Sequence, residues 1–196
     1  MSMKLTNMKA ALNQELLSVI LTAKKNLAGG ITRKGNDGKA RRGKIDTTGT
    51  LSKSITALPL RQKGNVISTG ITMADYGDFV DQGVSGTQLS TPKPSPFSFK
   101  TEGPGMAMTT SIIEWMKKKN IRVRDEKGRY SKGGFESYQF KGLAYVIARS
   151  IKRKGTPQTF FITTPFRTMT EALPRVIAEA LAKDFDEYIK TQFRTK

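Results

Sequence analysis

The chain contains no histidine and no cysteine among its 196 residues. Without cysteine it can form no disulfide, no zinc–thiolate site and no thiol nucleophile. Without histidine it lacks the commonest general base, the commonest protein metal ligand and every catalytic triad that contains His. The sequence also lacks a Walker phosphate-binding loop and a dinucleotide-binding glycine fingerprint. These absences remove most familiar enzyme sites, so we predict a protein that is not an enzyme and needs no cofactor or metal.

Long apolar runs are missing too. No stretch approaches the roughly 20 apolar residues that a membrane-spanning helix needs, and the N-terminus lacks the apolar core and small-residue cleavage site of a signal peptide. We therefore expect no membrane association. Hydrophobic residues make up 37% of the chain, below the usual share for a globular protein. A good part of the chain should therefore lie in loops or arms.

Acidic residues are outnumbered: 16 Asp and Glu stand against 34 Lys and Arg, which gives a net charge of +18. Segments 30–44, 117–132 and 149–154 carry most of this excess. Such concentration predicts a surface for an acidic partner, either nucleic acid or a neighbouring subunit. No DNA-reading motif is visible, so a DNA contact should involve phosphates without sequence preference. The residues expected on this basic surface are Arg33, Lys34, Arg41, Arg42, Lys117, Lys118, Lys119, Arg122 and Arg124.

Apolar residues at steps of three and four predict several helices. They span residues 4–28, a short stretch from about Thr48, 109–120, 141–154 and about 171–193. Gly29-Gly30 should end the first helix, and Pro174 is expected only in the first turn of the last one. Asp184, Asp186 and Glu187 should lie on the solvent face of that helix.

Alternating segments 56–61 and 66–72 predict a β-hairpin, with Pro59 at an edge or a bulge, and 159–164 predicts a further strand. The fold class is therefore α+β, with a small antiparallel sheet packed against a long N-terminal helix and a C-terminal helix. We expect one domain, 1–196, with long loop insertions at about 29–46, 84–107 and 121–139. The first of these should be flexible, and the third should turn at Lys127-Gly128.

Residues 74–83, with the sequence ADYGDFVDQG, are the most informative segment. A short aromatic, acidic and Gly-containing segment after a strand is typical of a tight exit from a sheet. On a helix, the spacing of Asp75, Asp78 and Asp81 would suit a magnesium site. The segment follows a strand, contains Gly77 and lacks an accompanying base, so we do not favour catalysis there.

The order of these segments resembles a known family, the neck or tail-completion (head–tail joining) proteins of tailed bacteriophages, similar to minor tail protein Z. The resemblance is carried by a long first helix, a segment like 48–55, a hairpin, a Tyr–x–x–Phe/Val–acid–x–Gly segment like 76–83, and a Gly-Thr-x-x-x-Phe-Phe segment like 155–161. An extra Trp-containing helix, like 112–116 here, marks one variant. The basic insertions have no counterpart, and 79–83 departs from the usual segment at two positions.

The resemblance implies a structural virion protein of the head–tail connector, with an α+β fold and no catalytic role. Such proteins form rings, for which six- or twelve-fold symmetry is plausible, against portal or adaptor proteins and tail proteins, with possible nonspecific contact with phage DNA. The implied location is the head–tail junction, after assembly in the host cytoplasm. Residues expected at subunit or ring interfaces are Tyr76, Phe79, Asp81, Phe97, Phe99, Phe160 and Phe161.

Two alternatives remain open. One is a basic, sequence-nonspecific nucleic-acid-binding protein of ordinary cellular type, which the charge supports. The other is a divalent-metal nuclease built on the Asp75, Asp78 and Asp81 spacing.

Overall fold

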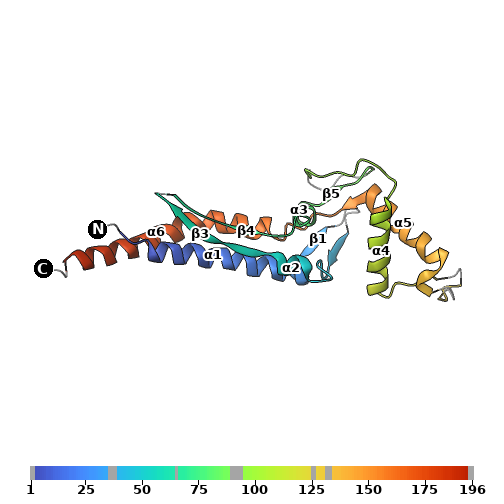
Figure 1. Cartoon of the computed structure of the whole chain (residues 1–196), viewed down its shortest axis with the longest axis horizontal. Coiled ribbons are helices and arrows are strands. Elements are labelled where there is room, and N and C mark those ends of the chain that lie inside the picture. Colours follow the sequence, from blue (N-terminus) through green and yellow to red (C-terminus); the bar gives the residue numbers. More distant parts are fainter. Residues whose placement is uncertain are drawn as a thin grey trace. The chain divides into compact units, whose positions relative to one another are not determined.

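The computed structural model of the chain describes residues 3–34, 39–64, 66–88, 95–124, 127–130 and 134–193. The fold class is α+β, as predicted, and the sheets are small and two-stranded (Figure 1). In chain order the elements are α1 (Thr6–Lys25), η1 (Asn26–Gly30), β1 (Thr32–Lys34), β2 (Ala40–Arg42), α2 (Thr50–Ser54), β3 (Thr56–Lys63), β4 (Val66–Thr72), α3 (Gly77–Gln82), β5 (Val84–Ser85), α4 (Met106–Lys118), η2 (Gly134–Glu136), α5 (Tyr138–Lys154), β6 (Gly155–Thr156) and α6 (Thr163–Phe193).

The chain divides into two compact units, where the sequence predicts one domain. Unit 1 contains residues 1–32, 41–81 and 159–196, and unit 2 contains 33–40 and 82–158. Most of unit 2 is one continuous stretch between the end of α3 and the start of α6. It combines two segments predicted as loop insertions with the helices α4 and α5. Each unit has its own cluster of buried apolar side chains, which explains why they separate.

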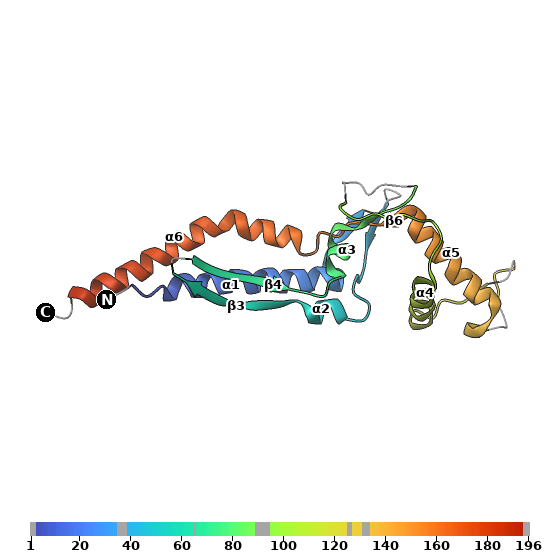
Figure 2. The same ribbon diagram turned by 45° about the horizontal axis from the view of Figure 1, so that its top comes forward.

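Unit 1 is built on α1 and α6, which run side by side in opposite directions, with the β3–β4 hairpin along α1 (Figure 2). Its core takes Ile20, Ala23 and Leu27 from one face of α1 and η1, because residues three and four apart share a face. Leu51 and Ile55, at α2 and just after it, and Phe161 complete the buried cluster. Gly29, at φ 110°, ends the helical run where the sequence predicts.

The hairpin confirms the predicted strands and bulge. Thr56 pairs with Thr72 and Lys63 with Val66, in antiparallel register. The register shifts between Leu58 and Arg61, the interval that contains Pro59. Proline has no N–H to donate to the ladder, so a strand that contains it is interrupted at that point.

The C-terminal helix begins at Thr163, eight residues before the predicted start at 171. Pro174 therefore lies inside the helix, and its expected place in the first turn is wrong. Proline removes one hydrogen bond of the helical ladder and bends the helix. Figure 2 shows α6 changing direction along its length.

The predicted strand at 159–164 is also wrong. The β-structure here is only β6, at Gly155–Thr156, and the chain then crosses without regular structure to α6. Phe160 has φ 48°, a left-handed conformation that an extended strand does not contain. Hydrogen bonds to the Asp81 carboxylate at Thr163 start the helix α6 there instead.

Unit 2 is organised around α4 and α5, which pack through Met116, Phe140 and Ala144. Ser137 caps α5: its hydroxyl accepts a 3.2 Å hydrogen bond from the Phe140 backbone N–H. Gly155 follows the predicted helix 141–154 directly, and it ends α5 with φ 75°, a conformation that glycine adopts easily.

The first predicted insertion contains more order than expected, and the third contains its predicted turn. Segment 30–44, predicted to be flexible, contains β1 and β2, which form a two-stranded sheet; residues 35–38 lie outside the described residues. In segment 121–139, an antiparallel bridge joins Arg124 and Tyr130 around the predicted turn. Among the described residues, no helix combines the length and apolar character needed to cross a membrane.

Candidate interaction surfaces

Asp81 connects the two segments that carry the family resemblance most clearly, 76–83 and 155–161, called the two motif segments below. Its side chain is 1% exposed, and its carboxylate accepts hydrogen bonds from the backbone N–H groups of Ile162 (2.9 Å) and Thr163 (3.3 Å) and from the Thr163 hydroxyl. The Asp81 carbonyl accepts from the N–H groups of Thr159 and Phe160, both at 3.0 Å. The acidic residue of segment 76–83 is therefore the N-terminal cap of α6, and a carboxylate there also favours the positive end of the helix dipole.

The glycine that ends the first motif allows a close approach in unit 2. Gly83 has φ +67°, and a Cβ there would lie 2.7 Å from the Thr156 carbonyl oxygen and 2.8 Å from the Gln158 nitrogen. Immediately after it, Val84 pairs with Thr156 and Ser85 with Gly155 in antiparallel register. Only glycine combines this backbone conformation with this spacing. The end of the first motif segment, residues 80–83, thus contacts residues 156–160 of the second.

Buried carboxylates cap three helices. Asp46 accepts from the backbone N–H groups of Gly49 (2.9 Å) and Ser52 (2.7 Å) at the start of α2. Asp184, which is 2% exposed, accepts from the N–H groups of Asn7 (2.8 Å) and Met8 (2.9 Å) at the start of α1. The expected solvent-facing position of Asp184 is therefore wrong. Its side chain replaces a local cap, since Leu5 at the N-cap position offers none.

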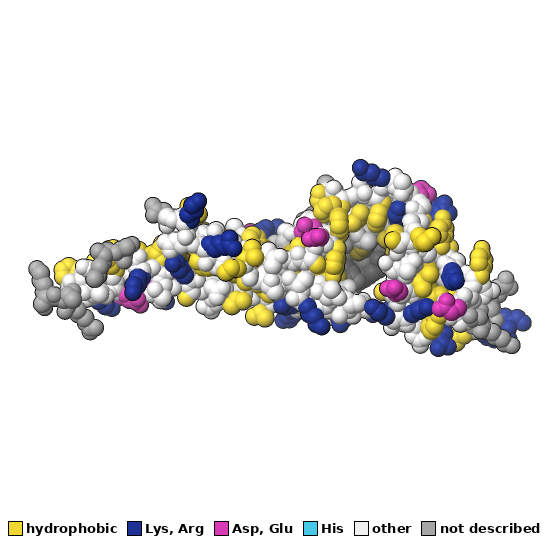
Figure 3. All heavy atoms as spheres, viewed as in Figure 1, with side chains coloured by type: hydrophobic (Ala, Val, Ile, Leu, Met, Phe, Trp, Pro, Cys, Tyr) yellow, Lys and Arg dark blue, Asp and Glu magenta, His cyan; other side chains and the backbone are white. Residues whose placement is uncertain are grey.

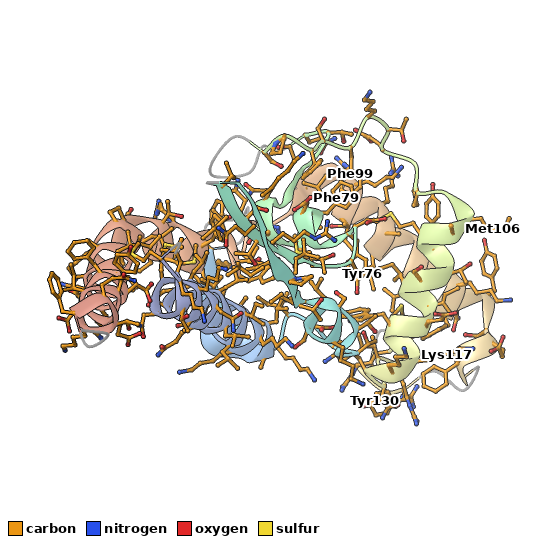
Figure 4. All side chains as sticks on the ribbon, turned by 60° about the vertical axis from the view of Figure 1, so that its left-hand side comes forward. Tyr76, Phe79, Phe99, Met106, Lys117 and Tyr130 are labelled. Atoms are coloured by element: carbon orange, nitrogen blue, oxygen red, sulfur yellow. The ribbon has the colours of Figure 1, made fainter. Side chains whose placement is uncertain are left out.

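The expected interface residues fall into three groups. Tyr76, just before α3, and Phe79, on α3, are each 44% exposed (Figure 4). Partial burial raises the pKa of the Tyr76 hydroxyl above its usual value, and the Asp46 carboxylate raises it further. Phe97, Phe99 and Phe160 are half-buried.

The expected interface position is wrong for Asp81 and Phe161, because their side chains are only 1% and 0% exposed within unit 1. Asp81 is engaged by the α6 cap, and Phe161 belongs to the buried core. Fully burying a phenylalanine stabilises a fold by about 2–3 kcal/mol. These two residues therefore hold unit 1 together and do not present side chains to a neighbouring subunit.

Phe97 and Phe99 lie on a strand-like segment fixed to β5. The Ser85 N–H donates to the Phe97 carbonyl, and the Phe99 N–H donates to the Ser85 carbonyl, both at 2.9 Å. The Lys152 ammonium lies 6.0 Å from the centre of the Phe99 ring. This part of the predicted insertion 84–107 is thus ordered within unit 2, while residues 89–94 lie outside the described residues.

The basic cluster of unit 2 comprises Lys117, Lys118, Lys119, Arg122, Arg124 and Tyr130. The Arg124 guanidinium carbon lies 4.7 Å from the centre of the Tyr130 ring and the Arg122 carbon 5.7 Å, and Arg124 also donates to the Tyr130 hydroxyl at 3.2 Å. Figure 4 shows Tyr130 and Lys117 at one end of α4 and Met106 at the other. Stacking on an aromatic ring holds the guanidinium groups in place while leaving part of their donor edge accessible.

Ion pairing neutralises only part of this cluster. Lys117 forms a 2.7 Å ion pair with Glu136, which lowers the pKa of that carboxyl group through the hydrogen bond and the nearby positive charge. Lys118 and Lys119 are exposed, as is Lys34 at the end of β1. The side chains of Arg33, Arg41 and Arg42 lie outside the described residues, so their predicted place on the basic surface stays a prediction.

No catalytic arrangement emerges around the acidic segment. Asp75 and Asp78 are exposed, whereas Asp81 is buried and caps α6. Among the described residues, no group of three or more acidic side chains could hold a metal ion. The magnesium site considered from the sequence is therefore not assembled by these three carboxylates.

Exposed apolar side chains are a feature that the helical periodicity did not reveal. Figure 3 shows hydrophobic side chains at the surface of both units. In unit 1 they include Leu21 (69% exposed), Phe185 (57%) and Phe193 (75%), and in unit 2 Met106 (87%) and Val146 (61%). Contiguous apolar patches mark contact sites, whereas single exposed apolar side chains are normal on a protein surface.

Comparison of the chain with protein-family models, with curated proteins and with solved structures gives no match.

Proposed function

We propose that the chain is a structural subunit of the head–tail connector of a tailed bacteriophage, part of the neck or tail-completion ring that joins the portal and head to the tail. The observation that carries the proposal is the contact between segments 76–83 and 155–161. The family resemblance rests in part on these two segments, and Asp81 and Gly83 of the first contact residues 156–160 of the second.

In this role the chain works through geometry. Exposed apolar side chains on both units would be covered by neighbouring copies and by the portal, adaptor and tail proteins of the virion. The basic cluster would face either the DNA that passes through the connector or an acidic neighbouring ring. Assembly would provide the burial that a single chain lacks.

The test is the composition and assembly of virus particles. Particles of the virus that encodes the chain should carry it at the head–tail junction, as seen by antibody labelling and electron microscopy. Deleting the gene should leave filled heads and separate tails, and supplying the chain in trans should restore joining. Normal joined particles without the chain would refute the proposal.

A second candidate, sequence-nonspecific nucleic-acid binding, is supported by the stacked arginines of the basic cluster. Guanidinium groups held beside an exposed tyrosine suit phosphate contact combined with stacking. Binding to random duplexes at increasing salt concentrations would test it. A free monomer that binds DNA tightly, and is absent from virus particles, would favour this function over the first.

A further inference from the structure

The last turns of α6 carry an apolar stripe that no described part of the chain covers. The stripe consists of Phe185, Ile189 and Phe193, which are 57%, 37% and 75% exposed. Residues four apart lie on one side of a helix, so the three side chains line up. Asp184 points toward α1, which it caps, so Phe185, about 100° further round the helix, points elsewhere.

The described residues of unit 1 leave much of the stripe uncovered. Asn7 contacts Asp184 and Glu187, and α1 begins only at Thr6. Figures 1 and 2 show the C-terminal turns of α6 extending past the start of α1. Ile189 and Phe193 are therefore on an overhanging end of the helix. Exposed apolar rows of this kind are typical of helix-in-groove contacts.

A groove lies at the opposite end of the same two helices. It has a volume of about 390 Å³ between α1 and the first half of α6. Apolar groups supply much of its lining, and Glu15 contributes a half-buried carboxylate for which the described residues supply no ion-pair partner. The lining includes Glu15, Val19, Ile31, Pro165, Met169 and Ala172.

The stripe of a chain cannot reach its own groove. Met169 and Ile189 belong to one continuous helix, and 20 residues of α-helix span about 30 Å. The occupant must therefore be another molecule. The groove carries a negative charge at Glu15, and its lining contains no Lys or Arg. Segment 183–196 around the stripe contains three carboxylates and four cations, Lys183, Lys190, Arg194 and Lys196. Asp184 is engaged at the start of α1 and Asp186 pairs with Lys190, so the remaining charge of the segment is positive. This charge complementarity favours a second copy of the chain.

We propose that the apolar stripe of one copy inserts into the α1–α6 groove of the next copy. Because the stripe and the groove are different surfaces, the contact is head-to-tail, and such contacts produce rings when the rotation closes. The inference rests on the proposed connector function for its biological setting and names the subunit contact within it. An aromatic side chain buries about 150–250 Å², so the stripe supplies less than the roughly 800 Å² per partner of a standard interface. It is the anchor of a larger contact.

The first experiment compares two charge substitutions at exposed apolar positions. Phe185→Lys/Ile189→Lys removes the stripe, and the control Leu21→Lys removes a 69% exposed leucine on α1. None of these side chains belongs to the buried core of unit 1, so circular dichroism and thermal melting should report native folding. In analytical ultracentrifugation the wild type and the control should self-associate, and the stripe variant should associate more than about tenfold more weakly, as expected for hot-spot residues. A wild type that stays monomeric, or a stripe variant that assembles like the wild type, would refute the inference.

A mixing experiment separates head-to-tail contact from stripe-to-stripe pairing. Ala172→Arg places a long cation at the exposed edge of the groove and leaves the stripe intact. Each variant alone should be monomeric, but an equal mixture should form heterodimers, because the stripe of one enters the groove of the other. Assembly of Ala172→Arg alone, or a mixture that remains monomeric, would overturn the contact. Neither result bears on whether the chain is found in virus particles, so the connector function would be judged separately.

Discussion

The carboxylate of Asp184, near the C-terminal end of the chain, accepts a 2.9 Å hydrogen bond from the backbone N–H of Met8, 176 residues earlier. A helix leaves its first N–H groups without partners inside the helix. Here Asp184 of the last helix, α6, supplies the hydrogen-bond acceptors for the first N–H groups of α1. Formation of α1 and docking of α6 therefore stabilise each other. The contact is non-local, and it forms only when both ends of the chain have come together.

Asp184→Asn should destabilise unit 1. The substitution keeps the size of the side chain but removes the charge that strengthens the hydrogen bonds from Asn7 and Met8. Loss of an N-terminal cap typically costs about 0.5–2 kcal/mol, so we expect a loss near the upper end of that range. Urea denaturation at neutral pH measures it. Asp186→Asn, two residues along on the exposed face, is the control and should have a small effect.

Asp184 should also contribute to acid sensitivity. Burial raises the pKa of its carboxyl group, but the hydrogen bonds from Met8, Asn7 and Thr6 outweigh burial and leave the pKa below its usual value. The stabilisation is therefore complete above the unfolded-state pKa of about 3.9 and is lost as the pH falls through the lower folded-state value. The free energy of unfolding of Asp184→Asn should fall less steeply over this range than that of the wild type. If the free energies of unfolding of the wild type and the variant fall equally steeply over this range, Asp184 is not the group responsible for the acid sensitivity.

Asp81→Asn should loosen the start of α6 more than any neighbouring acidic substitution. Asp81 accepts three hydrogen bonds at the Ile162–Thr163 turn and is 1% exposed. Hydrogen bonds to charged groups contribute about 1.5–3 kcal/mol, so we expect a loss of about 2 kcal/mol and faster hydrogen exchange in the first turns of α6. Asp78→Asn, at an exposed position one turn earlier, should change neither quantity. Equal effects of the two substitutions would contradict the capping role.

Gly83→Ala tests the close approach at the end of the first motif. A methyl group at φ +67° is strained, and it would also meet the Thr156 carbonyl oxygen at 2.7 Å. Left-handed strain alone costs about 1–2 kcal/mol, so the loss of stability should exceed that range. Gly103→Ala meets nothing within 4 Å and should be nearly neutral. Thermal melting of the two variants compares them directly.

Local patterns predicted the parts of this fold that depend on local chemistry. The β3–β4 hairpin, its interruption near Pro59, the glycine that ends α5 and the turn between Arg124 and Tyr130 all follow from residues close in sequence. The same holds for the long apolar face of α1, because helical periodicity is visible in one segment.

Contacts between distant segments were the ones that the sequence could not predict. Thr159 to Thr164 alternates like a strand, but Asp81, about 80 residues earlier, caps the chain at Thr163 and begins a helix there. Asp184 has the spacing of a solvent-facing residue, but it is buried because α1 begins beside it. The division into two units was not predicted for the same reason: α4 and α5 form a separate buried cluster with each other, through contacts between residues more than 20 positions apart.

Neutralising the basic cluster should show what the cluster binds. Lys118, Lys119, Arg122 and Arg124 are exposed and lie outside the buried apolar residues of unit 2, so their joint replacement by Gln should preserve folding. If the cluster binds DNA phosphates, affinity should fall equally for all sequences, and the slope of log K against log salt should become shallower by about 0.9 for each phosphate that the variant no longer neutralises.

A control variant in which Lys53, Arg61, Lys63 and Lys183 of unit 1 become Gln makes the same change in net charge. Because it leaves the stacked arginines in place, its salt slope should stay close to that of the wild type. Equally weakened binding in the two variants would mean that only total charge matters, and unchanged binding in both would leave the cluster facing an acidic protein neighbour.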